Sequence, residues 1–388
     1  MKTSPLIGSI VLATALCLGA VARGEEIEKV NLFYLGNSFS ENSLPAFQPS
    51  LAKSAGKEMT VTMSGGAGWQ TWMIVDRMIS DPEGKFKAVF EGDWNAVAIQ
   101  HFGEHPLLQD NPRTSVFDSS KPWPQPRDVS DFASASWIIE KFMAAHPGGR
   151  AFIYNSWPGI PAAGDFRKRV QDETRKSLEN QGLSREEVLK RVKERKPTLE
   201  EMIPLMKEFN YEAAWLAKYA PNRENPDLSE HAHSRDYVWS LMELLKNKHP
   251  QLWAERRLAL IPHGDVFLAL DRKMRAGQLP GIENVAFFSR DGGHVRAGLP
   301  RYTLAATCFA VMFRENPAKL DYSIYNDLKN YENENLKKLP GYVGKPYTHQ
   351  PDLGVLLEIT PERAKIVNDT IWEVVSEHPY TQINPARN

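Results

Sequence analysis

Short apolar runs alternate with amphipathic stretches along most of the chain. The apolar runs end in glycine or polar residues, which is typical of buried strands, and they cover residues 30–35, 59–63, 96–100, 151–155 and 258–262, with a further short strand expected at 285–288. The stretches with helical spacing are 43–55, 69–79, 129–145, 237–246, 265–276, 304–313 and 361–376. Strands that alternate with helices predict a parallel sheet covered by helices on both faces.

One region breaks this rhythm. Residues from about 165 to 226 are dense in Lys, Arg and Glu, and Val188, Leu189 and Val192 have helical spacing. We expect a helical insertion here, either a solvated hairpin or a cap over a functional site. The remainder of 28–388 reads as a single domain that ends in a helical extension at about 316–388.

The N-terminus has the pattern of an export signal. Lys2 precedes an apolar stretch at 6–20, and Ala20-Val21-Ala22 fits a small-x-small cleavage site, so residues 1–22 are expected to be a cleaved signal peptide. The stretch is too short for a comfortable membrane span, and we expect no stable membrane insertion after cleavage.

Cleavage after Ala22 would remove one of the two cysteines and leave Cys308, so no intrachain disulfide is expected. Cys308 lies in an apolar run and is expected to be a buried small hydrophobe. Export without disulfides favours a secreted or periplasmic bacterial protein. The formal net charge of −1 gives no broad basic surface, so a nucleic-acid partner is not expected.

Chemically useful residues follow the predicted strands. In doubly wound sheets such residues gather at the carboxyl ends of the strands. In chain order these are Ser38, the glycines at 65, 66 and 68, Gln100, Asn155, and finally Asp291 with His294. A serine, a histidine that can take its proton, an acid that orients the histidine, and amide donors for an oxyanion are the parts that acyl transfer needs.

These residues resemble the motifs of the SGNH (GDSL-like) hydrolases. Gly36-Asn37-Ser38-Phe39 is similar to the nucleophile block of that family, and Asp291-x-x-His294 is similar to its C-terminal block. The resemblance spans roughly residues 28–315. It implies a three-layer α/β/α sandwich with a mostly parallel, flavodoxin-like five-stranded sheet. No cofactor is expected.

The resemblance also implies a role for each residue. Ser38 would be the nucleophile, His294 the base and Asp291 the residue that orients it. The oxyanion hole would use the backbone N–H groups of Ser38 and Gly66 (or Gly65) and the amide of Gln100, with Asn155 as the alternative amide donor. The family usually has Asp at position 37 and Asn at position 100 of this chain; a Gln there resembles the carbohydrate-directed branch.

The remaining histidines give weaker signals. His101, Glu104 and His105 have the spacing of an inverted zinc-peptidase motif, but they follow a strand and run into Pro106, whereas such motifs lie on a helix. No metal site is therefore predicted. His101, His105 and His263 are expected instead to line the substrate pocket.

The sequence thus predicts a secreted serine esterase that hydrolyses carboxylic esters, with O-acetyl carbohydrate esters as the expected substrates, through an acyl-Ser38 intermediate. Two alternatives stay open. The same residues could transfer the acyl group to a carbohydrate hydroxyl, or the fold could serve a non-catalytic carbohydrate-binding protein. The oligomeric state is left open.

Overall fold

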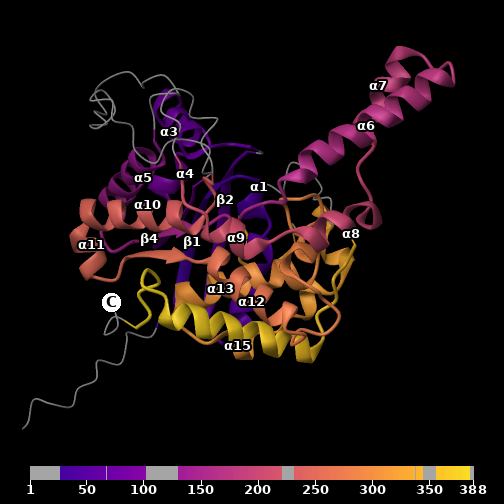
Figure 1. Ribbon diagram of the computed structural model, residues 1–388. Helices are drawn as coiled ribbons and strands as arrows, with labels where there is room; N and C mark the ends of the chain where they lie inside the picture. Colours follow the sequence, from indigo (N-terminus) through magenta and orange to yellow (C-terminus); the bar gives the residue numbers. More distant parts are fainter. Residues whose placement is uncertain are drawn as a thin grey trace, which may run out of the picture.

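A computed structural model describes residues 27–66, 68–101, 130–220, 231–336, 338–343 and 355–384. Its centre is one parallel sheet (Figure 1). The strand order in this sheet is β2-β1-β3-β4-β5. The strands are β1 (Lys29–Gly36), β2 (Glu58–Gly65), β3 (Ala96–Gln100), β4 (Arg150–Tyr154) and β5 (Leu258–Ile261). This is the flavodoxin-like doubly wound order, so the predicted fold class is confirmed.

The strands are almost continuously buried. Every residue of β3 and β5 is buried, as is β1 from Val30 onward. Continuous burial explains why these strands are apolar runs without alternation. Gly36 pairs with Gly65, and Gln100 pairs with Tyr154, so these strands end at one common edge.

Helices cover both faces of the sheet (Figure 1). On one face, α5 (Asp131–Ala145) contacts α3 (Thr71–Ser80), α4 (Ala88–Glu91) and α10 (Arg235–Lys248). On the other face α13 (Leu299–Phe313) contacts α2 (Gln48–Ser54), α12 (His263–Arg275) and α15 (Pro361–Glu377). A short helix, α11 (Pro250–Ala254), precedes β5.

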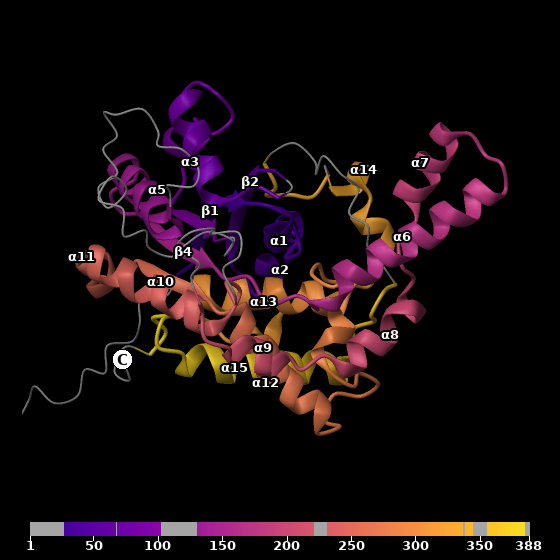
Figure 2. The ribbon, with the colours of Figure 1, turned by 45° about the horizontal axis from the view of Figure 1, so that its top comes forward.

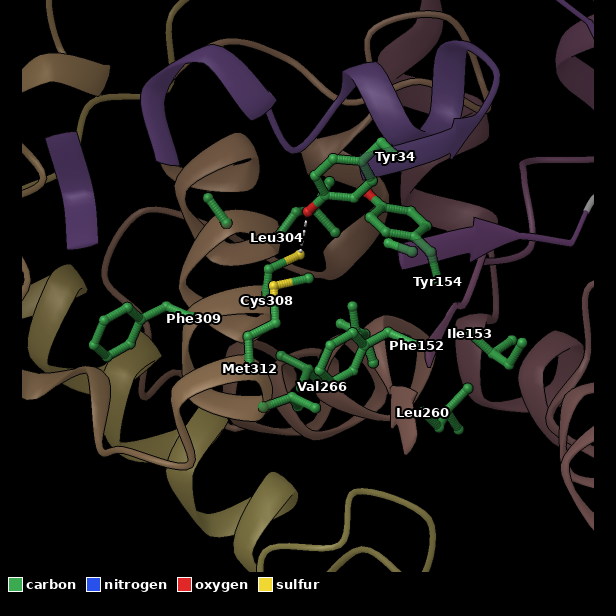
Figure 3. Close-up of a cluster of buried hydrophobic side chains, with 14 of the residues drawn as sticks. Tyr34, Phe152, Ile153, Tyr154, Leu260, Val266, Leu304, Cys308, Phe309 and Met312 are labelled. Carbon is green, nitrogen blue, oxygen red and sulfur yellow. Dashed lines mark hydrogen bonds between the residues drawn. The ribbon is translucent and has the colours of Figure 1, made fainter. Parts of the chain in front are cut away.

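The core under this second face is centred on α13, which is buried along its whole length. Figure 3 shows Leu304, Cys308 and Met312 on this helix, beside Tyr34 and Tyr154 of the sheet. The Tyr34 hydroxyl donates a hydrogen bond to Cys308 Sγ at 3.4 Å. Cys308 is a buried free thiol, as predicted, and burial raises its pKa to about 12.

Two expected elements differ in the structure. The region expected as one helix at 43–55 forms a 3₁₀ turn (Pro45–Phe47) followed by α2, and a separate short helix, α1 (Ser38–Glu41), precedes it. The strand expected at 285–288 is wrong, because Val285–Phe288 forms a 3₁₀ helix. Asn284 starts that turn by accepting a hydrogen bond from the Ala286 N–H at 2.9 Å.

The charged insertion is helical, as its spacing predicts. It contains α6 (Ala162–Asn180), α7 (Arg185–Glu194), α8 (Leu199–Glu208) and α9 (Tyr211–Leu216). Helices α6 and α7 pack on each other and project from the body (Figure 2). Their contact has a small core of its own, formed by Leu178, Val188 and Val192.

The C-terminal part contains 3₁₀ turns, α14 (Asn333–Leu336) and α15. The predicted signal peptide at 1–22 lies outside the described residues. Among the residues that the structure describes, no helix has the length and apolar character needed to cross a membrane.

Candidate active site

Three side chains form a hydrogen-bonded row at the carboxyl edge of the sheet. Ser38 Oγ lies 2.9 Å from His294 Nε2. On the other side of the ring, His294 Nδ1 lies 2.9 Å from Asp291 Oδ2 and 3.2 Å from Oδ1. A neutral imidazole that donates from Nδ1 to the carboxylate leaves Nε2 free to accept the serine proton.

The turn after β1 sets the position of Ser38. Asn37 caps α1 by accepting a hydrogen bond from the Phe39 N–H at 2.9 Å. Ser38 is the first residue of that helix, where the backbone N–H has no acceptor within the helix. Position 36 must be glycine, because a Cβ there would lie 2.1 Å from Ser40 Oγ.

The side chain of Gln100 holds this turn in place through hydrogen bonds. Its Oε1 accepts hydrogen bonds from the Asn37 N–H (3.1 Å), the Ser40 N–H (2.9 Å) and the Ser40 hydroxyl (2.5 Å). Its Nε2 donates to Asn37 Oδ1 at 2.8 Å. Only 2% of Gln100 is exposed, so its amide is a buried organiser of the turn that carries Ser38.

A second turn carries Asp291 and His294. Asp291 Oδ1 accepts hydrogen bonds from the backbone N–H groups of Gly293 (3.1 Å) and His294 (2.9 Å). Gly292 has a φ of +99°, and a Cβ there would lie 2.3 Å from the Ala163 Cβ. The turn is therefore closed by its own carboxylate and requires glycine at its centre.

The segment after β4 supports this second turn from outside. The Trp157 indole donates a hydrogen bond to Gly293 O at 3.0 Å, and the Ile160 N–H donates to Gly292 O at 2.6 Å. The loop that carries the histidine is thus fixed to the sheet by contacts with a distant part of the chain.

The environment of Asp291 keeps it ionised. Burial raises the pKa of this carboxyl, but hydrogen bonds and charge interactions with His294 and the charge of Arg290 outweigh burial and hold the pKa below its usual range. Arg290 Nε lies 3.3 Å from Asp291 Oδ2. An ionised Asp291 would stabilise a protonated His294 during proton transfer from Ser38.

Asn42 connects the two turns, and the sequence analysis did not identify it. Its Nδ2 donates to Ser38 O at 2.9 Å, while its Oδ1 accepts from the Val295 N–H at 3.1 Å. Only 2% of Asn42 is exposed. An asparagine four residues after the serine has no recognisable local pattern, because its partner lies 253 positions away.

The other expected oxyanion donors lie near the same edge. Gly66 directly follows β2, next to the Trp69 indole. Asn155 is fully buried; its Oδ1 accepts a hydrogen bond from the Gly264 N–H at 2.8 Å, and its Nδ2 lies 3.5 Å from His101 Nε2. Among the described residues, neither Gln100 nor Asn155 makes a side-chain hydrogen bond to His294 or to the Ser38 hydroxyl.

Two histidines expected in the substrate pocket are buried beneath the site. His101 is 2% exposed and stacks on Tyr237, and burial lowers its pKa to about 3. His263 has no exposed surface; its ring nitrogens lie 3.1 and 3.2 Å from the carbonyl oxygens of Asn155 and Leu304, and burial lowers its pKa to about 4. His105 lies outside the described residues.

The Phe39 ring lies beside the row and also contacts His233. The Phe39 ring is 5.3 Å from the His294 ring, 5.1 Å from that of Trp157 and 6.1 Å from that of His233, on which it stacks. His233 Nδ1 lies 2.9 Å from Ser156 Oγ.

Within the described part of the chain, no three His, Cys, Asp or Glu side chains converge in a way that could hold a metal ion.

No family model and no curated protein matches the chain. One similar solved structure is that of a DUF4886 family protein from Bacteroides uniformis, at 12% identity over 88% of this chain and 93% of that chain, with a TM-score of 0.38. Another is described as "a putative SGNH hydrolase" from Slackia heliotrinireducens, at 14% identity over 73% of this chain and 99% of that chain, with a TM-score of 0.33. At TM-scores this low, neither structure says what this chain does.

Proposed function

We propose that the protein is a serine esterase of the SGNH hydrolase type that cleaves carboxylic esters. The row formed by Ser38, His294 and Asp291 is the observation that carries the proposal, because each contact has the geometry that a nucleophile, its base and an orienting acid require. The row joins two separate turns of the chain, the one that carries Ser38 and the one that carries Asp291 and His294. A structural role alone does not account for an ionised acid, a histidine and a serine in that order.

The reaction proceeds in two halves. His294 Nε2 takes the Ser38 proton as the serine oxygen attacks the ester carbonyl, and the ionised Asp291 stabilises the resulting imidazolium. His294 then gives the proton to the departing alcohol, which leaves an acyl group on Ser38. Water, deprotonated by His294, attacks this acyl-enzyme and releases the acid.

The developing oxyanion needs donors at the serine. The backbone N–H of Ser38, at the start of α1, and that of Gly66, after β2, are the proposed backbone donors. Gln100 is the proposed side-chain donor. Its Nε2 carries two hydrogens, of which the bond to Asn37 uses one. Asn155 remains the alternative amide.

The proposed substrates are O-acetyl esters of carbohydrates outside the cytoplasm. The expected signal peptide at 1–22 would export the protein to the compartment where such esters occur. The partly exposed Phe39 ring, 5.3 Å from the His294 ring, offers an aromatic face of the kind that packs against the apolar face of a sugar ring.

The test is hydrolysis of p-nitrophenyl acetate by the mature protein, together with labelling by a fluorophosphonate probe. Ser38→Ala should lose labelling and lower kcat by at least about 10³-fold, since the nucleophile itself is removed. Ser177→Ala, an exposed serine on α6, is the matched control and should retain both. A Ser38→Ala protein that keeps its activity would refute the assignment, and a folded wild type that neither labels nor turns over would favour a carbohydrate-binding protein.

A further inference from the structure

A cavity of about 460 Å³ opens at the Asp291 end of the hydrogen-bonded row. The insertion forms one of its walls through residues of α6, α7, α8 and the segment between α7 and α8. The other lining residues are Arg290, Asp291, Arg296 and Val355. The lining residues that carry charge are Arg167, Lys193, Lys196, Arg290, Arg296 and Asp291.

The charge of this lining is strongly unbalanced. Five of these six side chains are cationic, and the one carboxylate among the described lining residues, Asp291, is already hydrogen-bonded to His294. The chain as a whole has a net charge of only −1. Positive charge is therefore concentrated here, and a cleft lined by one sign of charge attracts ligands of the opposite sign.

Arg296 is held in place before any ligand arrives. It is only 5% exposed, and its Nε and Nη1 donate to the carbonyl oxygens of Val355 (2.8 Å) and Phe287 (3.1 Å). Its Nη2 makes no hydrogen bond to another described residue. Arg290 also has a nitrogen, Nη1, that is buried without a partner in the described part of the chain. Arg290 thus keeps a buried donor that is costly to leave unused, and Arg296 keeps one guanidinium nitrogen without an acceptor among the described residues.

We propose that this cavity binds an anionic group, a carboxylate or a sulfate, on the carbohydrate that carries the ester. The inference rests on the proposed function and narrows its substrate class to acidic polysaccharides. A guanidinium recognises the oxygen atoms of carboxylate and sulfate groups through paired hydrogen bonds, and Lys193 and Lys196 add point charges from the insertion. The volume suits a sugar unit near the one whose ester reaches Ser38.

Binding is measured by calorimetry with the Ser38→Ala protein, so that no substrate is consumed. The probes are trigalacturonate for the carboxylate, a sulfated galactose trisaccharide without uronate for the sulfate, and neutral galactotriose. At low salt, at least one anionic probe should bind at least about tenfold more tightly than galactotriose, and added salt should remove much of that difference. Whichever anionic probe binds identifies the group.

Charge variants locate the site. The double substitution Lys193→Gln and Lys196→Gln should weaken binding of the anionic probe by about tenfold, since it removes two cations from the cavity wall. Lys176→Gln with Lys190→Gln removes the same total charge from exposed positions on α6 and α7 that do not line the cavity, and it should leave binding nearly unchanged.

The outcomes separate this inference from the proposed function. Equal affinity for anionic and neutral probes, or equal weakening by both lysine pairs, would overturn the anion site. Turnover of p-nitrophenyl acetate by the wild type tests the esterase independently. Tight anion binding without turnover would leave the anion site standing and remove only the catalytic proposal.

Discussion

The side-chain oxygen of Asn42 accepts a hydrogen bond from the backbone N–H of Val295 at 3.1 Å, across 253 positions of the chain. The same amide donates to Ser38 O at 2.9 Å. One buried side chain therefore sets the distance between the turn that carries the serine and the turn that carries the histidine.

Asn42→Ala should impair activity more than its distance from the ester suggests. Both turns lose a buried hydrogen bond, which costs about 1–3 kcal/mol of stability, and a displacement of about 1 Å between Ser38 and His294 costs on the order of 10²-fold in kcat. Urea unfolding and p-nitrophenyl acetate kinetics measure the two effects. Asn42 is a positioning residue, so kcat should fall while KM changes little.

The control for Asn42 is the exposed Asn247→Ala on α10, which should match the wild type in both measurements. Asn42→Asp keeps the acceptor for Val295 and loses the donor to Ser38, and its kcat should lie between those of Asn42→Ala and wild type. Normal kcat in Asn42→Ala would show that the two turns hold their spacing without this bridge.

Gln100→Ala should lower both stability and kcat. The substitution leaves the N–H groups of Asn37 and Ser40 without their acceptor in a buried turn, at a cost of about 1–3 kcal/mol for each unsatisfied group. If Gln100 also donates to the oxyanion, kcat falls further, by about 10²–10³-fold. Thermal unfolding and kcat, measured on the same preparation, separate the two roles. Loss of stability with wild-type kcat would restrict Gln100 to supporting the turn.

Asp291→Asn should remove stability that depends on pH. The folded-state pKa of Asp291 is below its usual value, so the ionised carboxylate stabilises the native state above the unfolded pKa of about 3.9, and this contribution is lost as pH falls through the folded pKa. Below about pH 4, the difference in unfolding free energy between wild type and Asp291→Asn should therefore shrink. Denaturant unfolding at pH 6 and at pH 2.5 measures it. A difference that stays constant between these pH values would show that the carboxylate charge adds no stability.

Gly292→Ala should disrupt the turn that carries Asp291 and His294. The new Cβ would combine a left-handed backbone at φ +99° with a 2.3 Å approach to Ala163. We expect a loss of about 2–4 kcal/mol and an inactive protein. Gly182→Ala is the matched control, because it has a φ of +74° with no heavy atom near its would-be Cβ. It should cost about 1 kcal/mol and leave kcat unchanged. Equal effects in both variants would mean that backbone strain alone decides the outcome.

The sequence predicts the sheet well because its strands are buried on both faces. Each central strand is then a continuous apolar run that ends in glycine or a polar residue, as 30–36 and 96–101 illustrate. The run at 285–288 has the same composition but forms a 3₁₀ turn, since four apolar residues carry no period that separates strand from helix. Tertiary contacts and the Asn284 cap decide between them.

The site is predicted less completely than the fold. Ser38, Asp291 and His294 belong to short motifs that chain order makes visible, and the structure brings them together. Contacts such as those of Asn42 depend on how two turns approach each other, which no local spacing encodes. The burial of His101 and His263 could not be predicted for the same reason. The local sequence of a histidine after a strand does not show whether its side chain faces solvent or is buried beneath the site.

The contact between Ser38 and His294 also has a kinetic consequence. Its two partners are 256 residues apart, and closing so long a loop is among the slowest kinds of event in folding. During refolding, the circular dichroism signal of the helices can recover early, because each helix forms from neighbouring residues. The proposed esterase activity can recover only when the turn after the first strand and the turn that carries His294 have met. Regain of that activity would therefore report completion of the native topology rather than formation of secondary structure.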